Sequence, residues 1–237
     1  MAELKMEHLE LIQNEATRKL VLAKEHFLKG NYHYSSAAIA YSKFVFVENG
    51  FSKVAQKSRS RKLRILEMGF GAGLNAILTY ERNLIAEIPV LYTAVDINPV
   101  PLKVIGRLKY DQHFDNSVYQ KFLLMHFSPW FSNTCVDNGN KSKNCFFELY
   151  KIQSDILQLD FDDTFDLVYY DAFSPQLQPE LWTYEILFKI YNACNTGAML
   201  VTHCCDDSVK DTLANVGFEI EIILDEKSKN RMIRAIK

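Results

Sequence analysis

The chain has 237 residues, of which 48% are hydrophobic, and a formal net charge of −2. This length fits one α/β domain with a small appendage and is short for two full domains. No stretch approaches the roughly 18 uncharged apolar residues that a membrane helix needs, and the charged N-terminus has no apolar signal-peptide core. Proteins that bind nucleic acid through many phosphates usually carry a basic surplus. A nucleic-acid role therefore needs a local basic patch, and residues 57–64 are one, although a solvated linker entering a strand fits that run better.

The cysteine pattern points to a reducing compartment. The count of five is odd, there is no C-x-x-C pair, and the adjacent Cys204 and Cys205 would make a poor disulfide. Zinc ligands are usually better spaced, so no metal site is expected. We therefore expect five reduced thiols and a cytoplasmic location. The cysteines are Cys135, Cys145, Cys194, Cys204 and Cys205.

The pattern changes near residue 62. Residues 1–62 are expected to form an N-terminal extension, with a strand or hairpin at 19–27 and a helical start within 35–51. Residues 63–237 then repeat strand, loop and helix, with a polar loop at 133–144. Strands are expected at 63–68, 89–96, 145–152, 165–171, 198–203, 218–224 and 231–236, and helices at 72–82, from Pro99 onward and at 208–216.

Strands that alternate with helices predict a parallel sheet covered on both faces. The last two strands are joined only by residues 225–230, so they must be antiparallel neighbours. This combination predicts the α/β architecture of Rossmann-like class I methyltransferases, with a seven-stranded, mostly parallel sheet and an antiparallel last strand.

A glycine loop follows the first of these strands, at residues 67–75. Its pattern is G-x-G-x-G, with Glu67 two positions ahead of the first glycine, whereas a dinucleotide loop reads G-x-G-x-x-G. S-adenosylmethionine has no phosphate and carries an ammonium that Glu67 is suited to hold. A glycine turn without ligand and an NAD loop remain alternatives. The expected cofactor contacts in this loop are Glu67, Gly69, Phe70, Gly71, Gly73 and Asn75.

Three aspartates follow later strands, at the edge where open α/β sheets bind ligands. Asp96 is expected to accept the ribose hydroxyls of the cofactor, and a helix-capping or turn role is its alternative. Asp155 is expected near the adenine amino group, with a helix N-cap nearly as favoured. Asp171 is expected to face the reacting methyl group of the cofactor, which makes it the candidate catalytic residue.

Aromatic and proline residues follow Asp171 and suggest a stiff binding loop. Phe173 and Trp182 are available to stack on a flat base, and Pro175 would stiffen the turn between them. Tyr32 is the upstream candidate for the same role. The alternative is a polar turn whose aromatic side chains join the core.

Together these segments resemble the methyltransferase half of MnmC, the family that makes 5-methylaminomethyl-2-thiouridine at the wobble position of tRNA. The resemblance rests on E-M-G-F-G-A-G-L-N at 67–75, D-A-F-S-P at 171–175 and P-E-L-W at 179–182. It continues in L-V-T-H-C at 200–204, where the family pattern is L-V-T-Y-C. The chain departs from the pattern at 205–207, where two aspartates replace a basic segment.

The resemblance implies S-adenosyl-L-methionine as cofactor and N-methylation of the aminomethyl group of 5-aminomethyl-(2-thio)uridine in the anticodon loop of tRNA. It implies that Asp171 orients the target amine. It also implies the stand-alone form without the flavin oxidase half, with a separate flavin oxidase or upstream modification enzymes as possible partners and no membrane contact.

Other functions stay open at this point. A methyltransferase of the same fold that acts on a small amine or another nucleic acid would keep every cofactor residue. A non-catalytic binding subunit would need neither the glycine loop nor Asp171. An aminopropyltransferase shares the architecture, but its glycine-glycine-aspartate loop is not seen here.

Overall fold

The computed structural model describes residues 36–57, 61–106, 108–137, 145–161, 164–226 and 228–237. The predicted hairpin at 19–27 and the candidate Tyr32 lie outside the described residues. No helix within these ranges is long and apolar enough to cross a membrane.

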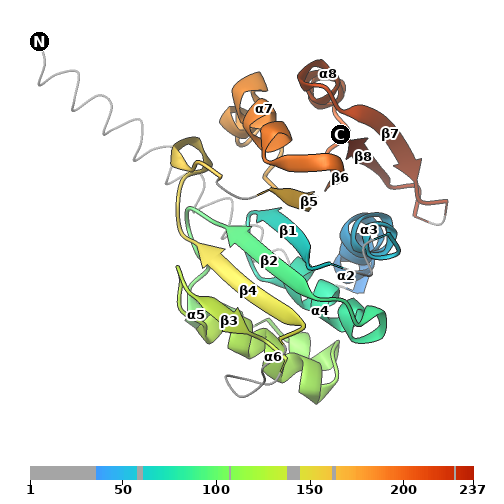
Figure 1. Cartoon of the computed structure of the whole chain (residues 1–237). Coiled ribbons are helices and arrows are strands. Elements are labelled where there is room, and N and C mark those ends of the chain that lie inside the picture. Colours follow the sequence, from blue (N-terminus) through green and yellow to red (C-terminus); the bar gives the residue numbers. More distant parts are fainter. Residues whose placement is uncertain (1–35, 58–60, 107, 138–144, 162–163, 227) are drawn as a thin grey trace, which may run out of the picture.

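One mixed sheet runs through the molecule (Figure 1), in the order β3-β4-β2-β1-β5-β6-β8-β7. Strands β4, β2, β1, β5 and β6 are parallel, and β8 lies antiparallel between β6 and β7. This confirms the predicted Rossmann-like sheet with its antiparallel last strand. The strands are β1 Leu63–Met68, β2 Val90–Val95, β3 Asn133–Cys135, β4 Phe147–Ile152, β5 Phe165–Tyr170, β6 Cys194–Thr202, β7 Glu219–Leu224 and β8 Arg231–Ile236.

Strand β3 is an eighth strand that the sequence did not predict. It pairs antiparallel with β4 at the edge of the sheet, inside the segment expected to be a polar loop. Its three residues, Asn133–Cys135, are too few and too polar to show the alternation by which a strand is recognised.

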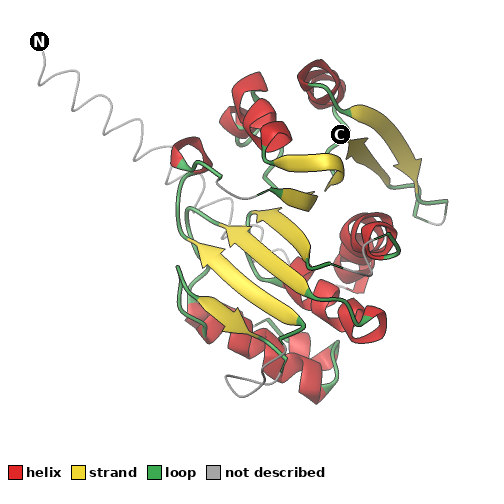
Figure 2. Cartoon of the chain, viewed as in Figure 1, coloured by secondary structure: helices red, strands yellow, loops and turns green. Residues whose placement is uncertain are grey.

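Helices flank the strands on both sides (Figure 2). The first described segment combines α2, the π-helix η2 and α3 in one continuous run. Helices α6 and α7 were not predicted. The helices are α2 Ser36–Ser42, η2 Lys43–Phe51, α3 Ser52–Ala55, α4 Leu74–Ala86, α5 Leu102–Ile105, η3 Tyr110–Gln112, α6 Asn116–Phe127, η4 Ile156–Gln158, η5 Pro179–Trp182, α7 Tyr184–Asn192 and α8 Asp207–Val216.

The central strand β5 shows why the sheet needs both layers. Every one of its residues is buried, as expected for a parallel strand covered on both faces. Leu167 and Tyr169 pack into the cluster that contains η2, α4 and α6, whereas Val168 and Tyr170 pack into the cluster that contains α7 and α8. The alternation follows from the two-residue period of a strand.

Residues 36–57, part of the predicted extension, pack onto this sheet. Val45 and Phe51 of η2 are fully buried in the same cluster as Tyr169. A Cβ on Gly50 would lie 3.1 Å from Val201 and 3.2 Å from Tyr169, so this helix approaches the strands closely. This segment therefore stabilises the sheet directly.

The basic run at 57–64 contributes charges to the fold rather than a free patch. Arg61 makes two hydrogen bonds to the buried carboxylate of Asp166, at 2.8 and 2.6 Å. Lys62 pairs with Glu148 at 2.8 Å. Because both side chains are engaged, the linker interpretation fits the described part of this run better than phosphate binding.

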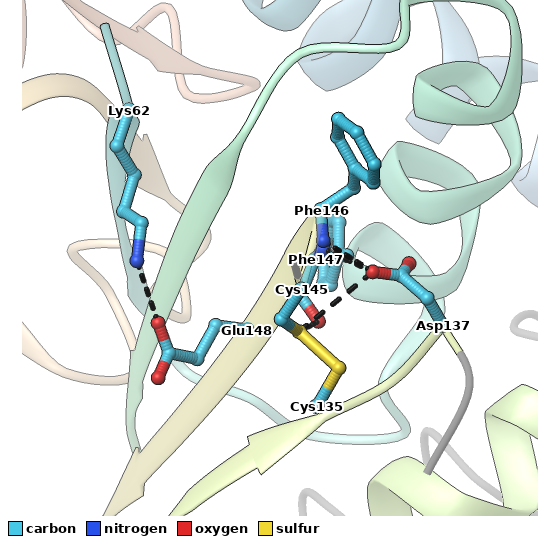
Figure 3. Close-up of polar contacts among 7 residues, drawn as sticks. All are labelled: Lys62, Cys135, Asp137, Cys145, Phe146, Phe147 and Glu148. Atoms are coloured by element: carbon cyan, nitrogen blue, oxygen red, sulfur yellow. Dashed lines mark hydrogen bonds and ion pairs between the residues drawn. A yellow bond between two sulfur atoms is a disulfide. The ribbon is translucent and has the colours of Figure 1, made fainter. Parts of the chain in front are cut away.

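The expectation of five reduced cysteines is wrong for two of them. Cys135 and Cys145 form a disulfide between β3 and the segment before β4 (Figure 3). Strand pairing brings the two residues together, and their separation in sequence gave no sign of it. Asp137 supports the same hairpin, since one of its carboxylate oxygens accepts the backbone N–H of Phe147 at 2.8 Å. Cys194, Cys204 and Cys205 are free.

Candidate active site

A cavity of about 420 Å³ opens at the carboxyl ends of the parallel strands. Its walls come from the loops after β1, β2, β4, β5 and β6, with Ser42 contributed by α2. This is the edge at which open α/β sheets bind their ligands, because the loops there turn away from the strands and leave a crevice.

The glycine loop after β1 forms one wall, and its backbone requires glycine at two positions. Gly69 has φ +89°, and a Cβ there would lie 3.1 Å from the carbonyl oxygen of Asp171. Gly73 has φ +69°, and its Cβ would lie 2.8 Å from Nε2 of His126. Because Gly69 and Gly73 have no side chain, the loop backbone can adopt these φ angles and lie directly against Asp171 and His126. Phe70 and Gly71 line the cavity beside them.

Asp96 ties the glycine loop to the end of β2. One carboxylate oxygen accepts the Gly71 N–H at 2.9 Å, and the other accepts the Asn98 N–H at 2.8 Å. Asp96 is buried as a residue and still lines the cavity. Each carboxylate oxygen has further lone pairs, so this side chain can also accept hydrogen bonds from a ligand.

Asp155 is a helix cap that also lies on the cavity wall. Its carboxylate accepts the Leu157 N–H at 3.0 Å and so caps the short helix η4. Asp155 also lines the cavity together with Ser154 and Ile156. The cap orients the carboxylate and leaves it on the cavity wall.

Asn75 joins two carboxylates at the start of α4. Its amide nitrogen donates to Oε1 of Glu67 at 3.0 Å and to Oδ2 of Asp171 at 2.8 Å. Asn75 and Asp171 line the cavity, whereas Glu67 lies behind them and is not among the described residues of the wall. Burial, and secondarily the charge of Asp171, raise the pKa of Glu67 well above its ordinary value. Within the described structure, Glu67 Oε2 and Asn75 Oδ1 are buried without hydrogen-bond partners.

Asp171 also contacts a histidine that the sequence did not single out. Oδ1 of Asp171 lies 3.3 Å from Nδ1 of His203, and both side chains are about one third exposed, at 31% and 34%. Burial alone would lower the pKa of His203, but the hydrogen bond and the charge of Asp171 raise it above its ordinary value. His203 directly follows β6, the neighbour of β5, and this position at the carboxyl edge was the available signal.

The aromatic candidates after β5 separate into two groups. Phe173 lines the cavity, with Ser174 and Leu177 from the same loop. Trp182 is only 6% exposed, packs edge-on against Tyr170 at 4.9 Å and donates Nε1–H to the Phe173 carbonyl at 2.7 Å. The buried ring of Trp182 fits the alternative in which these aromatic side chains join the core.

Pro175 lies in the same loop, but its neighbours rather than Pro175 itself contribute to the described wall.

The charged groups of the cavity wall are mostly acidic. Its acidic side chains in the described part of the chain are four carboxylates; it contains neither lysine nor arginine, and its basic group is His203 beside Asp171. A wall of this kind favours a cationic occupant. The four carboxylates belong to Asp96, Asp155, Asp171 and Glu180.

Comparison with known proteins agrees with this geometry. Residues 120–237 match the family model of S-adenosyl-L-methionine-dependent methyltransferases. The tRNA 5-methylaminomethyl-2-thiouridine biosynthesis bifunctional protein MnmC of Delftia acidovorans is 25% identical over 210 residues, which cover 86% of this chain and 32% of that protein. The corresponding protein of Campylobacter concisus is 23% identical and is matched over 82% of this chain and 30% of its own length. The chain thus spans about a third of the length of these curated relatives.

A solved structure shows the same fold. MnmC2 from Aquifex aeolicus superposes with a TM-score of 0.61 at 22% identity, over 84% of this chain and 60% of that one. The chain holds an MnmC-like, S-adenosyl-L-methionine-dependent methyltransferase domain.

The cavity of this MnmC-like domain suits the cofactor on chemical grounds. Asn75 Oδ1 is a buried acceptor without a partner in the described structure, and it belongs to a residue of the wall. Such an atom fits an ammonium donor, which would satisfy it. The glycines let the backbone of the loop approach a ligand closely, and the acidic wall complements a ligand that carries a sulfonium and an ammonium.

Proposed function

We propose that the MnmC-like domain transfers a methyl group from S-adenosyl-L-methionine to the amino nitrogen of 5-aminomethyl-(2-thio)uridine at the wobble position of tRNA. The observation that carries the proposal is the position of Asp171. It lies on the cavity wall, directly beside the glycine loop, and is held by both Asn75 and His203. The named activity of the MnmC relatives supports tRNA as the acceptor.

The glycine loop, Asp96 and Asp155 would hold the cofactor, since all three contribute to one side of the cavity wall. Asp96 would accept hydrogen bonds from the ribose hydroxyls, and Asp155 would contact the adenine. Asn75 Oδ1 would accept a hydrogen bond from the ammonium, while the amide nitrogen of Asn75 donates to Oε1 of Glu67 behind it. Glu67 thus acts through Asn75, although the sequence predicted a direct contact.

Bound S-adenosyl-L-methionine supplies a methyl carbon on a sulfonium, and the S–CH₃ electron pair stays on sulfur when the N–CH₃ bond forms. The acceptor must be the neutral amine, because an ammonium has no lone pair. A primary alkylamine has a pKa near that of lysine, about 10.4, so it begins mostly protonated at neutral pH. Asp171 accepts an N–H hydrogen bond and aims the nitrogen at the methyl carbon, and such alignment lowers the barrier by several kcal/mol.

The acceptor base lies between the ring of Phe173 and the rest of the loop that connects β5 to η5. An anticodon loop is single-stranded, so displaying one base requires little unstacking. Phe173 offers the aromatic face, and Pro175 stiffens the loop. Tyr32 stays a candidate for the second face. The tRNA acceptor, rather than the cysteines, argues for a reaction in the cytoplasm, downstream of an enzyme that supplies the aminomethyl group.

The experiment is methyl transfer from labelled S-adenosyl-L-methionine to tRNA that carries unmethylated 5-aminomethyl-2-thiouridine, followed by nucleoside analysis. Label is expected in the methylaminomethyl nucleoside and should fall by a factor of 10² or more in Asp171→Ala, with a much smaller effect on cofactor affinity. The matched control is Asp111→Ala, since Asp111 is exposed and outside the cavity wall. Cofactor binding without any labelled nucleoside would refute the tRNA assignment.

A second candidate is a methyltransferase of the same fold that acts on a small primary amine. It is favoured by the wall of four carboxylates without lysine or arginine, which suits a free cationic amine better than a phosphate-rich ligand. Transfer of label to small amines but not to tRNA would support this alternative.

A further inference from the structure

We propose that His203, oriented by Asp171, accepts the proton that the acceptor ammonium must lose before it is methylated. The inference rests on the proposed function, because it needs an amine acceptor. It adds a second catalytic residue, which the sequence motifs did not identify.

The proximity of Asp171 favours one tautomer of His203. A carboxylate accepts hydrogen bonds only, so the ring nitrogen next to Oδ1 of Asp171, at 3.3 Å, carries the hydrogen. Nδ1–H therefore donates to Asp171, and Nε2 keeps the lone pair. Because His203 belongs to the cavity wall, the proton of an acceptor ammonium moves from its nitrogen to Nε2, and the N–H electron pair stays on nitrogen as the lone pair that attacks the methyl carbon.

Carboxylates are the first set of other titratable groups around His203. Those on neighbouring elements belong to Asp171, Glu180, Asp206 and, behind Asn75, Glu67. A carboxylate is in general a weaker base than an imidazole, and Glu67, whose pKa burial raises, is separated from the cavity wall by Asn75.

The thiols are unsuitable for a different reason. Cys204 and Cys205 directly follow His203, and burial raises the pKa of each above its ordinary value, so both stay protonated at neutral pH. An imidazole, with an ordinary pKa near 6.5, is the side chain suited to this range. The carboxylate of Asp171 makes His203 a stronger base than an isolated imidazole.

Asp171 contacts both His203 and Asn75 through different carboxylate oxygens. One carboxylate oxygen, Oδ1, faces His203, and the other, Oδ2, accepts the Asn75 amide. Proton transfer to His203 forms an imidazolium beside Asp171, and the carboxylate stabilises that charge.

The test compares the single-turnover methyl-transfer rate of the wild-type chain and His203→Gln between pH 6 and pH 10. We expect a loss of about 100-fold at pH 7 that shrinks to a few-fold near pH 10, because the amine is then neutral without help. Cofactor affinity should stay within about threefold. His113→Gln is the matched control, since His113 is exposed and not part of the wall. His203→Tyr repeats the test with an aromatic side chain that lacks a neutral-range base.

A loss that is equal at every pH, or no loss, overturns the role of His203 while the proposed function stands. If wild-type chain leaves tRNA unlabelled, the proposed function fails, and the same pH comparison is made with 5-aminomethyluridine as a free nucleoside. The shrinking defect must then appear with that amine. Absence of transfer to either acceptor overturns both proposals.

Discussion

The side-chain amide of Asn75 donates to Oδ2 of Asp171 at 2.8 Å. The same nitrogen reaches Oε1 of Glu67 at 3.0 Å, so one amide group separates two carboxylates and neutralises part of their repulsion. The predicted catalytic aspartate is thereby fixed by the glycine loop's own helix. The proposed cofactor and acceptor halves of the cavity share this amide.

Replacement of Asn75 tests that arrangement. Asn75→Ala removes the amide from both carboxylates and should lower the free energy of unfolding by on the order of 2 kcal/mol. Asn75→Asp should be worse, because it places a third carboxyl group between the other two. Urea unfolding of both variants, with Asn192→Ala on the exposed end of α7 as control, checks the order. An Asn75→Asp variant as stable as wild type would contradict the bridging role.

Glu67 should destabilise the cofactor-free fold at neutral pH. Burial is the main cause of its raised pKa, so the folded state favours the protonated form. The resulting stabilisation is fully present below the ordinary value of 4.5 and is lost as pH rises through the folded-state pKa. Glu67→Gln should therefore raise the melting temperature at pH 8 by about 3 °C, which for a domain of this size is on the order of 1 kcal/mol.

The gain from Glu67→Gln should disappear below pH 4.5, where the carboxyl group is protonated in both states. Thermal melts across this range measure it, and Glu185→Gln on the exposed face of α7 provides the control. An unchanged or lower melting temperature of Glu67→Gln at pH 8 would show that the folded chain compensates the negative charge of Glu67.

His126 should make the glycine loop sensitive to acid. Its Nε2 lies 3.2 Å from the Ala72 carbonyl, and burial lowers its pKa from 6.5 to about 4. A depressed folded-state pKa gives stability that is present above 6.5 and lost as pH falls toward 4. The difference corresponds to roughly 3 kcal/mol at about 1.36 kcal/mol for each pKa unit.

His126→Gln should remove this pH dependence. The variant is expected to be less stable than wild type at pH 7.5, because it loses ring contacts with Phe70 and Phe122. Its stability should fall less than that of wild type between pH 6.5 and 4. Urea midpoints at several pH values test the difference. Parallel curves for the two proteins would exclude His126 as the source.

Much of this fold could be predicted because its strands are marked locally. β1 and β5 are apolar runs bounded by a glycine loop and by Asp171, and the predicted limits of β1 agree with the structure. α6 escaped prediction because its apolar residues do not form a clean helical stripe. Cys135 and Cys145 meet because β3 pairs with β4. That pairing depends on the assembled sheet and could not be predicted from the local sequence.

The limits of the site prediction have a similar origin. Residue type suggested carboxylates and aromatics at the cavity, but the side of a strand or loop that each faces depends on packing. Glu67 lies behind Asn75, and Trp182 lies in the core, although both residues are next to the wall in sequence. His203 reaches Asp171 only because β6 pairs with β5.

Asp96 should affect cofactor binding. Asp96→Asn keeps one acceptor oxygen, loses the charge and one acceptor for the ribose, and turns its NH2 group toward the backbone N–H of Gly71 or Asn98, so it should also loosen the glycine loop. Hydrogen bonds to charged groups are worth about 1.5–3 kcal/mol, so we expect the cofactor Kd to rise by about 10- to 100-fold. Isothermal titration of S-adenosyl-L-methionine measures this, and the conservative Asp96→Glu tests whether reach matters. A Kd unchanged in Asp96→Asn would remove this carboxylate from the proposed cofactor contacts.

The disulfide between Cys135 and Cys145 should stabilise the edge of the sheet without affecting the site. It closes a loop with a sequence separation of 10 residues. Chain-entropy arguments assign such a loop about 2–3 kcal/mol. Cys145 precedes the amino end of β4, whereas the cavity residues Ser154 and Asp155 follow its carboxyl end. Reduction should therefore lower the melting temperature and leave cofactor affinity unchanged.

The double variant Cys135→Ser with Cys145→Ser is the matched control, because a reductant should not alter its melting temperature. Thiol labelling of the unfolded wild-type chain without reductant should modify the three free cysteines, Cys194, Cys204 and Cys205. Labelling of all five would show that the bridge is absent and would restore the expectation of a fully reduced chain. If the bridge is present and its reduction weakens cofactor binding, the two ends of β4 are coupled through the strand.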